Sequence, residues 1–363
     1  MYILGFLLVL GPLVTVHELG HYLVGRWFGV KADAFSIGFG RELTGWTDKR
    51  GTRWKLAAIP LGGYVQFKGD MNPASLPDPT VPTEPDTFQG RPLWQRALIV
   101  FAGPATNILV ALAIYAAFFS LIGNPVPADP ADSTVVERFA EKSAARDAGV
   151  EVGDRIVTID GRPVATFNDV AELVALYPGK NIVLGVEREG ERIAIQLTIG
   201  SVVETDQFGN ASRLGRLGVY SREYRYDPVG VSQSVPLAID QSISIVRMMV
   251  TGLKQIIVGE RSFQELGGPI KIAKYSGEQL SLGPISFVNF VALISLNLAF
   301  INLLPIPALD GGHLAFYAAE AVRRKPVSPR GQEWAYRAGM ALVLMLMVVV
   351  TVNDIVSLPI FGS

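Results

Sequence analysis

The sequence predicts a polytopic α-helical membrane protein with about four transmembrane helices and one inserted α/β domain. Hydrophobic residues make up 49% of the chain, more than in most soluble enzymes, and charged residues make up 18%, more than in a bare helical bundle. Four segments are uncharged or nearly so and reach, or approach, the length that crosses a bilayer: residues 2–28, 97–123, 282–309 and 338–353. Strand-forming runs and turn residues gather between the second and third of these segments.

The first segment, residues 2–28, contains the pentad His17-Glu18-Leu19-Gly20-His21. Because helix residues four apart lie about 40° apart around the axis, His17 and His21 can present two imidazoles to one metal ion. Glu18 then lies beside a water on that ion, which is the H-E-x-x-H arrangement of zinc peptidases. The pattern also arises by chance, but ionisable side chains in hydrocarbon cost free energy unless they have a partner. The placement therefore favours a metal site.

A third ligand is needed, because hydrolytic zinc usually has three protein ligands and one water. The chain has three histidines and no cysteine, so the candidates are His313 and a carboxylate. Asp310 follows the third segment, where Pro305 and Pro307 end the helix, and we expect the two glycines after it to let the backbone turn tightly. From its position alone, Asp310 is equally well interpreted as an interfacial carboxylate at a helix end.

Basic residues predict the orientation of the four segments. The connection after the first segment and the connection between the third and fourth are both rich in Lys and Arg, so both are predicted to be cytoplasmic. Both termini and the long region between the second and third segments then lie on the opposite side. The net charge of −1 leaves no basic footprint for nucleic acid, and we expect no nucleic-acid partner.

The region between the second and third segments has the signals of a small α/β domain. Strand-forming runs flank two hairpin-type turns, Asp160-Gly161 and Glu189-Gly190. Residues 143–161 end in G-D-x-I-x-x-I-D-G and resemble the bacterial PDZ pattern, with a generic α/β module as the alternative. A PDZ domain captures an extended peptide or a C-terminus by strand addition. Residues 217–219 are candidates for the ligand edge.

The stretch after this domain predicts an amphipathic helix, because six aliphatic residues recur at spacings of four and three. These residues are Ile239, Ile243, Val246, Val250, Leu253 and Ile257. Two interpretations stay open: a helix packed on the domain or on the transmembrane segments, and a helix on the membrane surface. The chain is thus expected to have four parts: residues 1–123 with the pentad, a PDZ domain at 124–222, the amphipathic segment 223–281, and residues 282–363 with the third ligand.

The pentad, the run at residues 302–312 and the PDZ pattern between them resemble the site-2 protease family of intramembrane zinc metalloproteases. The likeness is greatest to its branch around the bacterial regulator of sigma-E protease (RseP), and residues 62–65, 101–107 and 267–270 share in it. The resemblance implies that one Zn²⁺ per chain is bound, with Glu18 as the general base. The implied zinc ligands are His17, His21 and Asp310.

The resemblance also implies a re-entrant β-hairpin in the first cytoplasmic connection, along which a substrate adds as a strand. Its implied substrate-binding residues are Gly62, Gly63, Tyr64, Val65 and Gln66. Asn302 and Pro305 match positions tied to substrate handling in the family. The best-known members of this branch carry two PDZ modules in tandem, whereas this chain has room for one. The size filter assigned to the tandem therefore does not transfer directly.

The implied activity is cleavage of transmembrane segments of single-span substrates in regulated intramembrane proteolysis. The expected substrates are an anti-sigma factor after a first outer-side cut, or remnant signal peptides, with membrane lipid around the helices. The expected location is the bacterial inner membrane, with the PDZ domain and both termini on the periplasmic side. Two other classes are weaker. Glu18 has no use in a catalytically silent PDZ adaptor, and the chain has no internal repeat of the kind found in many transporters.

Overall fold

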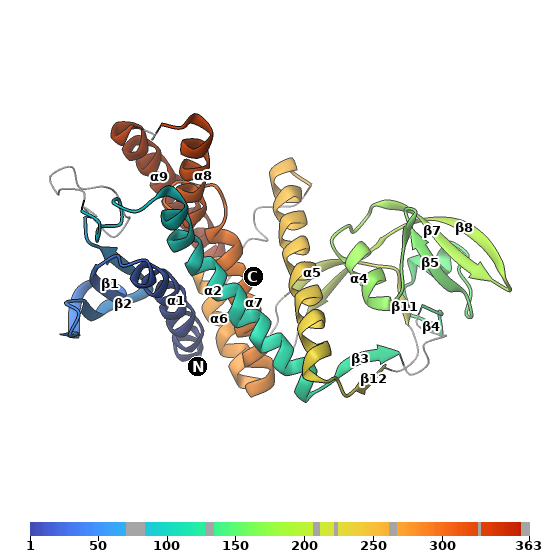
Figure 1. Ribbon diagram of the computed structural model, residues 1–363. Coiled ribbons are helices and arrows are strands. Elements are labelled where there is room, and N and C mark those ends of the chain that lie inside the picture. Colours follow the sequence, from blue (N-terminus) through green and yellow to red (C-terminus); the bar gives the residue numbers. More distant parts are fainter. Residues whose placement is uncertain are drawn as a thin grey trace. The chain divides into compact units, whose positions relative to one another are not determined.

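The computed structural model describes residues 1–69, 84–127, 134–205, 211–220, 224–260, 267–325 and 328–356. The chain divides into two compact units, whose elements are labelled in Figure 1. The first unit takes in Met1–Tyr115, Gln241–Val246 and Arg261–Ser363, and the second takes in Ala116–Asp240 and Arg247–Glu260.

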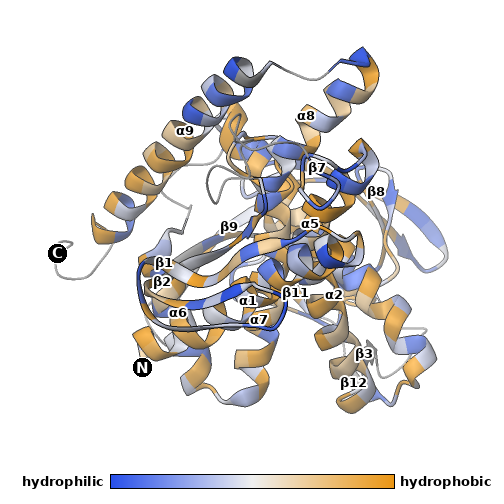
Figure 2. Ribbon diagram, turned by 60° about the vertical axis from the view of Figure 1, so that its left-hand side comes forward, coloured by the Kyte–Doolittle hydropathy of each residue, from blue (hydrophilic) through white to orange (hydrophobic). Residues whose placement is uncertain are grey.

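Four helices of the described chain are long and apolar enough to cross a membrane. They are α1 (Tyr2–Trp27), α2 (Leu93–Leu121), α7 (Pro284–Asn302) and α9 (Pro329–Val356). Each coincides with one of the four predicted segments. Helix α9 begins before the predicted start, because charged residues continue the helix there and Glu333 pairs with Arg337 one turn later at 2.6 Å. Figure 2 shows polar residues near the start of α9 and mostly hydrophobic residues in its second half.

The third predicted segment, residues 282–309, contains α7 and an irregular turn after it, and a further helix, α8 (Asp310–Arg323), begins directly after the segment. Pro305 and Pro307 lie in this turn, as expected, but the tight bend comes before Asp310, at Ala308 with a φ of +89°. The prediction that Gly311 and Gly312 form the turn was therefore wrong. Both glycines are helical, and a Cβ on either would overlap backbone carbonyl oxygens of residues 303–306. They are needed because the start of α8 packs closely against the turn that precedes it, residues 303–307.

Helix α6 (Pro269–Ser281) packs along α1 through small residues. A Cβ on Gly5 would lie 2.7 Å from the Ser276 carbonyl, and a Cβ on Gly277 would overlap the Tyr2 ring. The start of α6 is capped by Asp354 of α9, whose buried carboxylate accepts hydrogen bonds from the backbone N–H groups of residues 268, 270 and 271 at 3.0–3.1 Å. A carboxylate at this position satisfies free N–H groups and complements the helix dipole. It ties α9 to α6.

The first connection forms a long β-ribbon beside α1, visible in Figure 1. It consists of β1 (Ala32–Thr47) and β2 (Arg53–Phe67), which pair antiparallel with register irregularities. Residues 34–37 of β1 pair with residues 63–66 and also with residues 53–56, so the ribbon folds back on itself. Its aromatic residues pack on α1: the Tyr22 ring lies 5.9 Å from Phe35 and 5.2 Å from Trp54. A hairpin in the predicted connection is therefore present.

The second unit contains a four-stranded sheet in the order β6-β5-β7-β8. The strands are β5 (Arg155–Ile159), β6 (Arg162–Pro163), β7 (Asn181–Arg188) and β8 (Glu191–Thr198), accompanied by α3 (Ala144–Asp147) and α4 (Phe167–Ala175). The hairpin turns Asp160-Gly161 and Glu189-Gly190 are confirmed. All four residues have positive φ, as a type I′ turn requires. An aliphatic core lies beneath the sheet, with Ile156, Leu184 and Val186 fully buried.

Three further strand pairs complete the second unit. They are β3 (Asn124–Pro127) with β12 (Tyr224–Asp227), β4 (Arg138–Phe139) with β11 (Val219–Tyr220), and β9 (Gly200–Thr205) with β10 (Ala211–Arg216). The predicted amphipathic helix is α5 (Val231–Val258). Four of the six residues of its apolar stripe are exposed, from 40% at Ile239 to 73% at Ile257, and Val246 and Leu253 are partly buried. A position for this stripe on the membrane surface stays a prediction.

Candidate functional site

The predicted metal ligands converge at one point between α1 and α8. One turn of α1 brings His17 Nε2 and His21 Nε2 to 3.2 Å, with their rings edge to face. Asp310, the first residue of α8, places Oδ2 3.1 Å from His17 Nε2 and 3.5 Å from His21 Nε2. Among the described residues, this is the one group of three or more His, Cys, Asp or Glu side chains that could hold a metal ion.

The spacing of these three atoms fits a zinc ion. Tetrahedral zinc with bonds of about 2.0–2.1 Å places neighbouring ligand atoms about 3.3 Å apart, which matches the three observed separations. In addition, Asp310 Oδ2 is buried and makes no hydrogen bond among the described residues. A buried carboxylate oxygen without a donor is costly, and a cation between it and the two imidazoles would remove that cost.

His313, the other candidate for the third ligand, does not join this group. It lies on α8 one turn after Asp310, and its ring is 6.5 Å from that of Tyr317. Its position after two glycines predicts a loop that leaves the membrane, and this prediction is wrong, because α8 begins at Asp310 and continues through His313. Helix α8 is held against α2 by the Arg96–Glu320 ion pair at 2.9 Å, with the Arg96 guanidinium 5.1 Å from the centre of the Tyr317 ring.

Helix α2 supplies the wall behind the two imidazoles, and sequence reasoning gave its residues no role. Ile99, Gly103 and Asn107 follow one another at intervals of four on one face of the helix. The Ile99 carbonyl oxygen lies 2.8 Å from His21 Nδ1, and the Asn107 side-chain amide lies 3.3 Å from His17 Nδ1. A Cβ on Gly103 would overlap the His21 ring and would lie 2.7 Å from His17 Nε2. The sequence signal for this role of α2 is weak: Asn107 is an amide side chain in the uncharged segment 97–123, four residues after Gly103.

Glu18 lies between the imidazoles and the end of β2. The Val65 backbone N–H donates a hydrogen bond to its carboxylate. A Cβ on Gly63 would approach the Glu18 Cγ to 3.1 Å, so the strand passes directly beside Glu18. Tyr64 and Gln66 lie on the same strand, paired with Ser36 and Ala34 of β1.

Three other predicted substrate-binding residues lie near this region without a described contact to the ligand atoms. Gly62 lies within β2, directly before residues 63–66, with a φ of +154°, and a Cβ there would overlap the Phe39 ring. Asn302 ends α7, and Pro305 is exposed in the turn that leads to Asp310.

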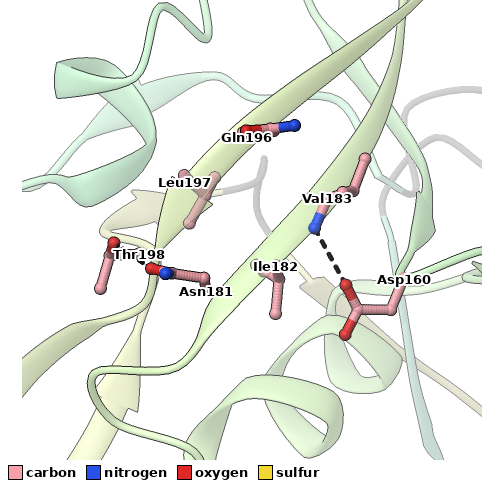
Figure 3. A pocket seen from close by; sticks show the side chains of 7 residues that line it. All are labelled: Asp160, Asn181, Ile182, Val183, Gln196, Leu197 and Thr198. Atoms are coloured by element: carbon pink, nitrogen blue, oxygen red, sulfur yellow. Dashed lines mark hydrogen bonds between the residues drawn. The ribbon is translucent and has the colours of Figure 1, made fainter.

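Two hollows lie among the described residues of the second unit, and the side chains that line them form no catalytic cluster. One, of about 320 Å³, lies over β7 and β8 (Figure 3). Its one carboxylate, Asp160, accepts a hydrogen bond from the Val183 N–H at 2.9 Å and pairs with Lys180, and both interactions lower the pKa of Asp160. The other, of about 290 Å³, is a mostly apolar groove between α4 and residues 214–219.

Comparisons with known proteins agree with this arrangement. The model of "Peptidase family M50" matches residues 5–346. A protein provisionally named zinc metalloprotease from Rhizobium meliloti is 46% identical, and the match covers 96% of this chain and 95% of that protein. A similarly named protein from Agrobacterium fabrum is 44% identical over 98% and 96% of the two chains. Metalloprotease MmpA from Caulobacter vibrioides is 35% identical over 97% and 95%.

Among solved structures, the PDZ domain of the SdrC-like protein from Listeria monocytogenes matches 25% of this chain and 87% of its own, with 13% identity and a TM-score of 0.20. The family assignment depends on the sequence matches, which run through both the pentad and Asp310 over almost the whole chain. The chain therefore belongs to peptidase family M50, the site-2 protease family.

Proposed function

We propose that this protein is an intramembrane zinc metalloprotease that cleaves transmembrane segments of single-span membrane proteins. The observation that carries the proposal is the convergence of His17 Nε2, His21 Nε2 and Asp310 Oδ2 beside Glu18, on helices apolar enough to cross a membrane. Buried ionisable groups in such helices are maintained for function, because they cost free energy otherwise.

The residues of this site have distinct roles in hydrolysis. His17, His21 and Asp310 would hold a zinc ion, which would lower the pKa of a bound water and polarise the scissile carbonyl. Glu18 accepts the proton of the attacking water at its carboxylate and delivers it to the nitrogen of the leaving amine. The Val65 N–H keeps the Glu18 carboxylate beside the ligand atoms. Asp310 holds the metal and transfers no proton.

The ribbon of β1 and β2 provides the means to open a substrate helix. A transmembrane helix has every backbone group hydrogen-bonded, so it must unwind before water can reach a peptide bond. Residues 63–66 pair with β1 along one edge, and the other edge, from which the Val65 N–H reaches Glu18, lies beside Glu18 of α1. A substrate strand added there regains backbone partners beside the reacting atoms. Gly62 allows the backbone bend that directs this edge of the strand toward Glu18. We assign Asn302 and Pro305, at the end of α7 and in the turn after it, to the path by which the substrate approaches.

The second unit acts as the peptide-binding module, which we assign as a single PDZ domain. The support is its G-D-x-I-x-x-I-D-G run and the apolar groove between α4 and residues 214–219, where an extended chain or C-terminus would add as a strand. The basic connections put this module and both termini on the periplasmic side of a bacterial inner membrane. An anti-sigma factor already cut on its outer side, or a remnant signal peptide, has the single span that this arrangement accepts.

A Glu18→Gln variant tests the proposal. Purified wild-type protein and variant are reconstituted in lipid nanodiscs with a single-span model substrate, and the zinc content of each is measured. We expect cleavage to be lost and zinc to stay at one ion per chain, because the amide keeps the shape and removes the base. Glu333→Gln, at an exposed ion pair on α9, is the matched control and should cleave normally. Cleavage by Glu18→Gln near the wild-type rate, or wild-type protein without zinc, would refute the proposal.

A further inference from the structure

The contact between Asn107 and His17 brings two hydrogen-bond donors together when His17 binds a metal. If His17 binds the metal through Nε2, as the position of that atom requires, its neutral ring carries its proton on Nδ1 and donates from there. The group 3.3 Å from Nδ1 is the Asn107 Nδ2, which is also a donor. Two N–H groups would then face each other in a fully buried place, since Asn107 is 0% exposed.

The other atom of the same amide shows how the conflict is resolved. Asn107 Oδ1 is buried and has no hydrogen-bond donor among the described residues. The oxygen and nitrogen of an amide have nearly the same shape, so their assignment follows from the hydrogen bonds they can make. A half-turn of the amide about its last bond gives the oxygen the Nδ1 proton and removes the donor–donor contact.

We propose that Asn107 is a positioning residue of the metal centre, whose Oδ1 accepts the proton of His17 Nδ1 and thereby fixes Nε2 as the ligand atom. The proposal rests on the proposed function, because it needs the metal at Nε2. His17 then has a hydrogen-bond acceptor for its Nδ1 proton. His21 already has one, because its Nδ1 donates to the Ile99 carbonyl oxygen at 2.8 Å. Metal-binding imidazoles almost always donate their other N–H in this way.

The backbone around Asn107 is fixed independently of its side chain. Its carbonyl accepts a hydrogen bond from the Ser295 hydroxyl of α7 at 2.8 Å, and both residues are completely buried. Because residues 99, 103 and 107 share one face of α2, the same helix presents a carbonyl to one imidazole, an amide to the other and a glycine between them. Asn107 is therefore held in register with His17 by three helices.

Two substitutions of opposite character test the orientation of the amide. Asn107→Leu keeps the branched shape of the side chain and removes the acceptor, whereas Asn107→Asp keeps an acceptor and removes the donor. Zinc affinity is measured on the purified full-length proteins by competition with a chelator, and the melting temperature of each metal-free protein reports folding. Asn289→Leu, the same exchange at an exposed position of α7, is the control. We expect Asn107→Leu to bind zinc about 10- to 100-fold more weakly, while Asn107→Asp and the control stay near wild type.

The outcomes separate this proposal from the function on which it rests. If Asn107→Asp loses as much zinc affinity as Asn107→Leu, the amide donates to the ring and the proposal is overturned. It is also overturned if Asn107→Leu binds zinc like the wild type. If Asn107→Leu does not fold, the aspartate variant alone decides, because only an acceptor facing Nδ1 allows it to keep zinc. Wild-type protein that binds no zinc would instead refute the metalloprotease assignment.

Discussion

Gly103→Ala places one methyl group against both imidazoles and tests how closely α2 must approach the metal ligands. The added carbon would overlap the His21 ring and would lie 2.7 Å from His17 Nε2, whereas ordinary van der Waals contact begins at 3.4 Å. The His17 ring or the helix must therefore move by about 0.7 Å, and the His21 ring by more, whereas the tolerance in a zinc–ligand distance is about 0.2 Å. Overpacking of this kind costs about 1–3 kcal/mol. If the ligands take the strain, zinc affinity falls about 5- to 140-fold.

The assay is zinc competition with a chelator, together with the melting temperature of the metal-free protein and the absorption spectrum of the cobalt-substituted protein, which reports ligand geometry. Gly11→Ala is the matched control, because Gly11 is on the ligand-bearing helix and has nothing within 4 Å of the added carbon. We expect the control to bind zinc normally and to gain up to about 1 kcal/mol of helix stability. Unchanged zinc affinity, melting temperature and cobalt spectrum in Gly103→Ala would refute the close approach of α2.

Two further predictions concern carboxylates in the two units. Asp310→Asn should lose zinc while His313→Ala keeps it, as measured by metal analysis of the purified proteins, and the reverse result would show that His313 is the ligand. In the second unit, burial alone would raise the pKa of Asp154, but hydrogen bonds from Arg188 and from the Glu151 N–H, with the charge of Arg188, hold it below its usual value. This stabilisation is present above the unfolded pKa of about 3.9 and is lost as pH falls through the lower folded pKa. The hydrogen-exchange protection factors of β5 and β7, which correct for the intrinsic pH dependence of exchange, should therefore fall below pH 4, and Asp154→Asn should weaken that pH dependence.

The features that were predicted correctly depend on short-range or solvent constraints. Long uncharged segments identify α1, α2, α7 and α9, because charges in hydrocarbon are costly. The turn at Asp160-Gly161 could be predicted because few residues adopt two successive positive φ values. The pentad brings its two imidazoles together by helix periodicity alone, and the structure gives an Nε2–Nε2 distance of 3.2 Å.

The features that were missed depend on contacts between distant parts of the chain. Nothing near Asn107 in the sequence indicates that His17 is its neighbour, since the pairing depends on how α2 packs on α1. The bend at Ala308 was misplaced to the glycines after Asp310, because a glycine that permits close packing has the same sequence signal as one that permits a turn. The family resemblance, and not residue spacing, selected Asp310 over His313.

The two ends of the chain contribute to the same three-atom cluster, and this has a consequence for biosynthesis. His17 and His21 enter the membrane early in translation, whereas Asp310 is made only after α2, the whole second unit and α7. Ligands so distant in sequence come together late in folding, because the intervening loop must be closed first. An unfinished chain thus has two imidazoles and Glu18 but no complete metal cage. The metal site of the nascent protein is therefore completed only when α8 has been made.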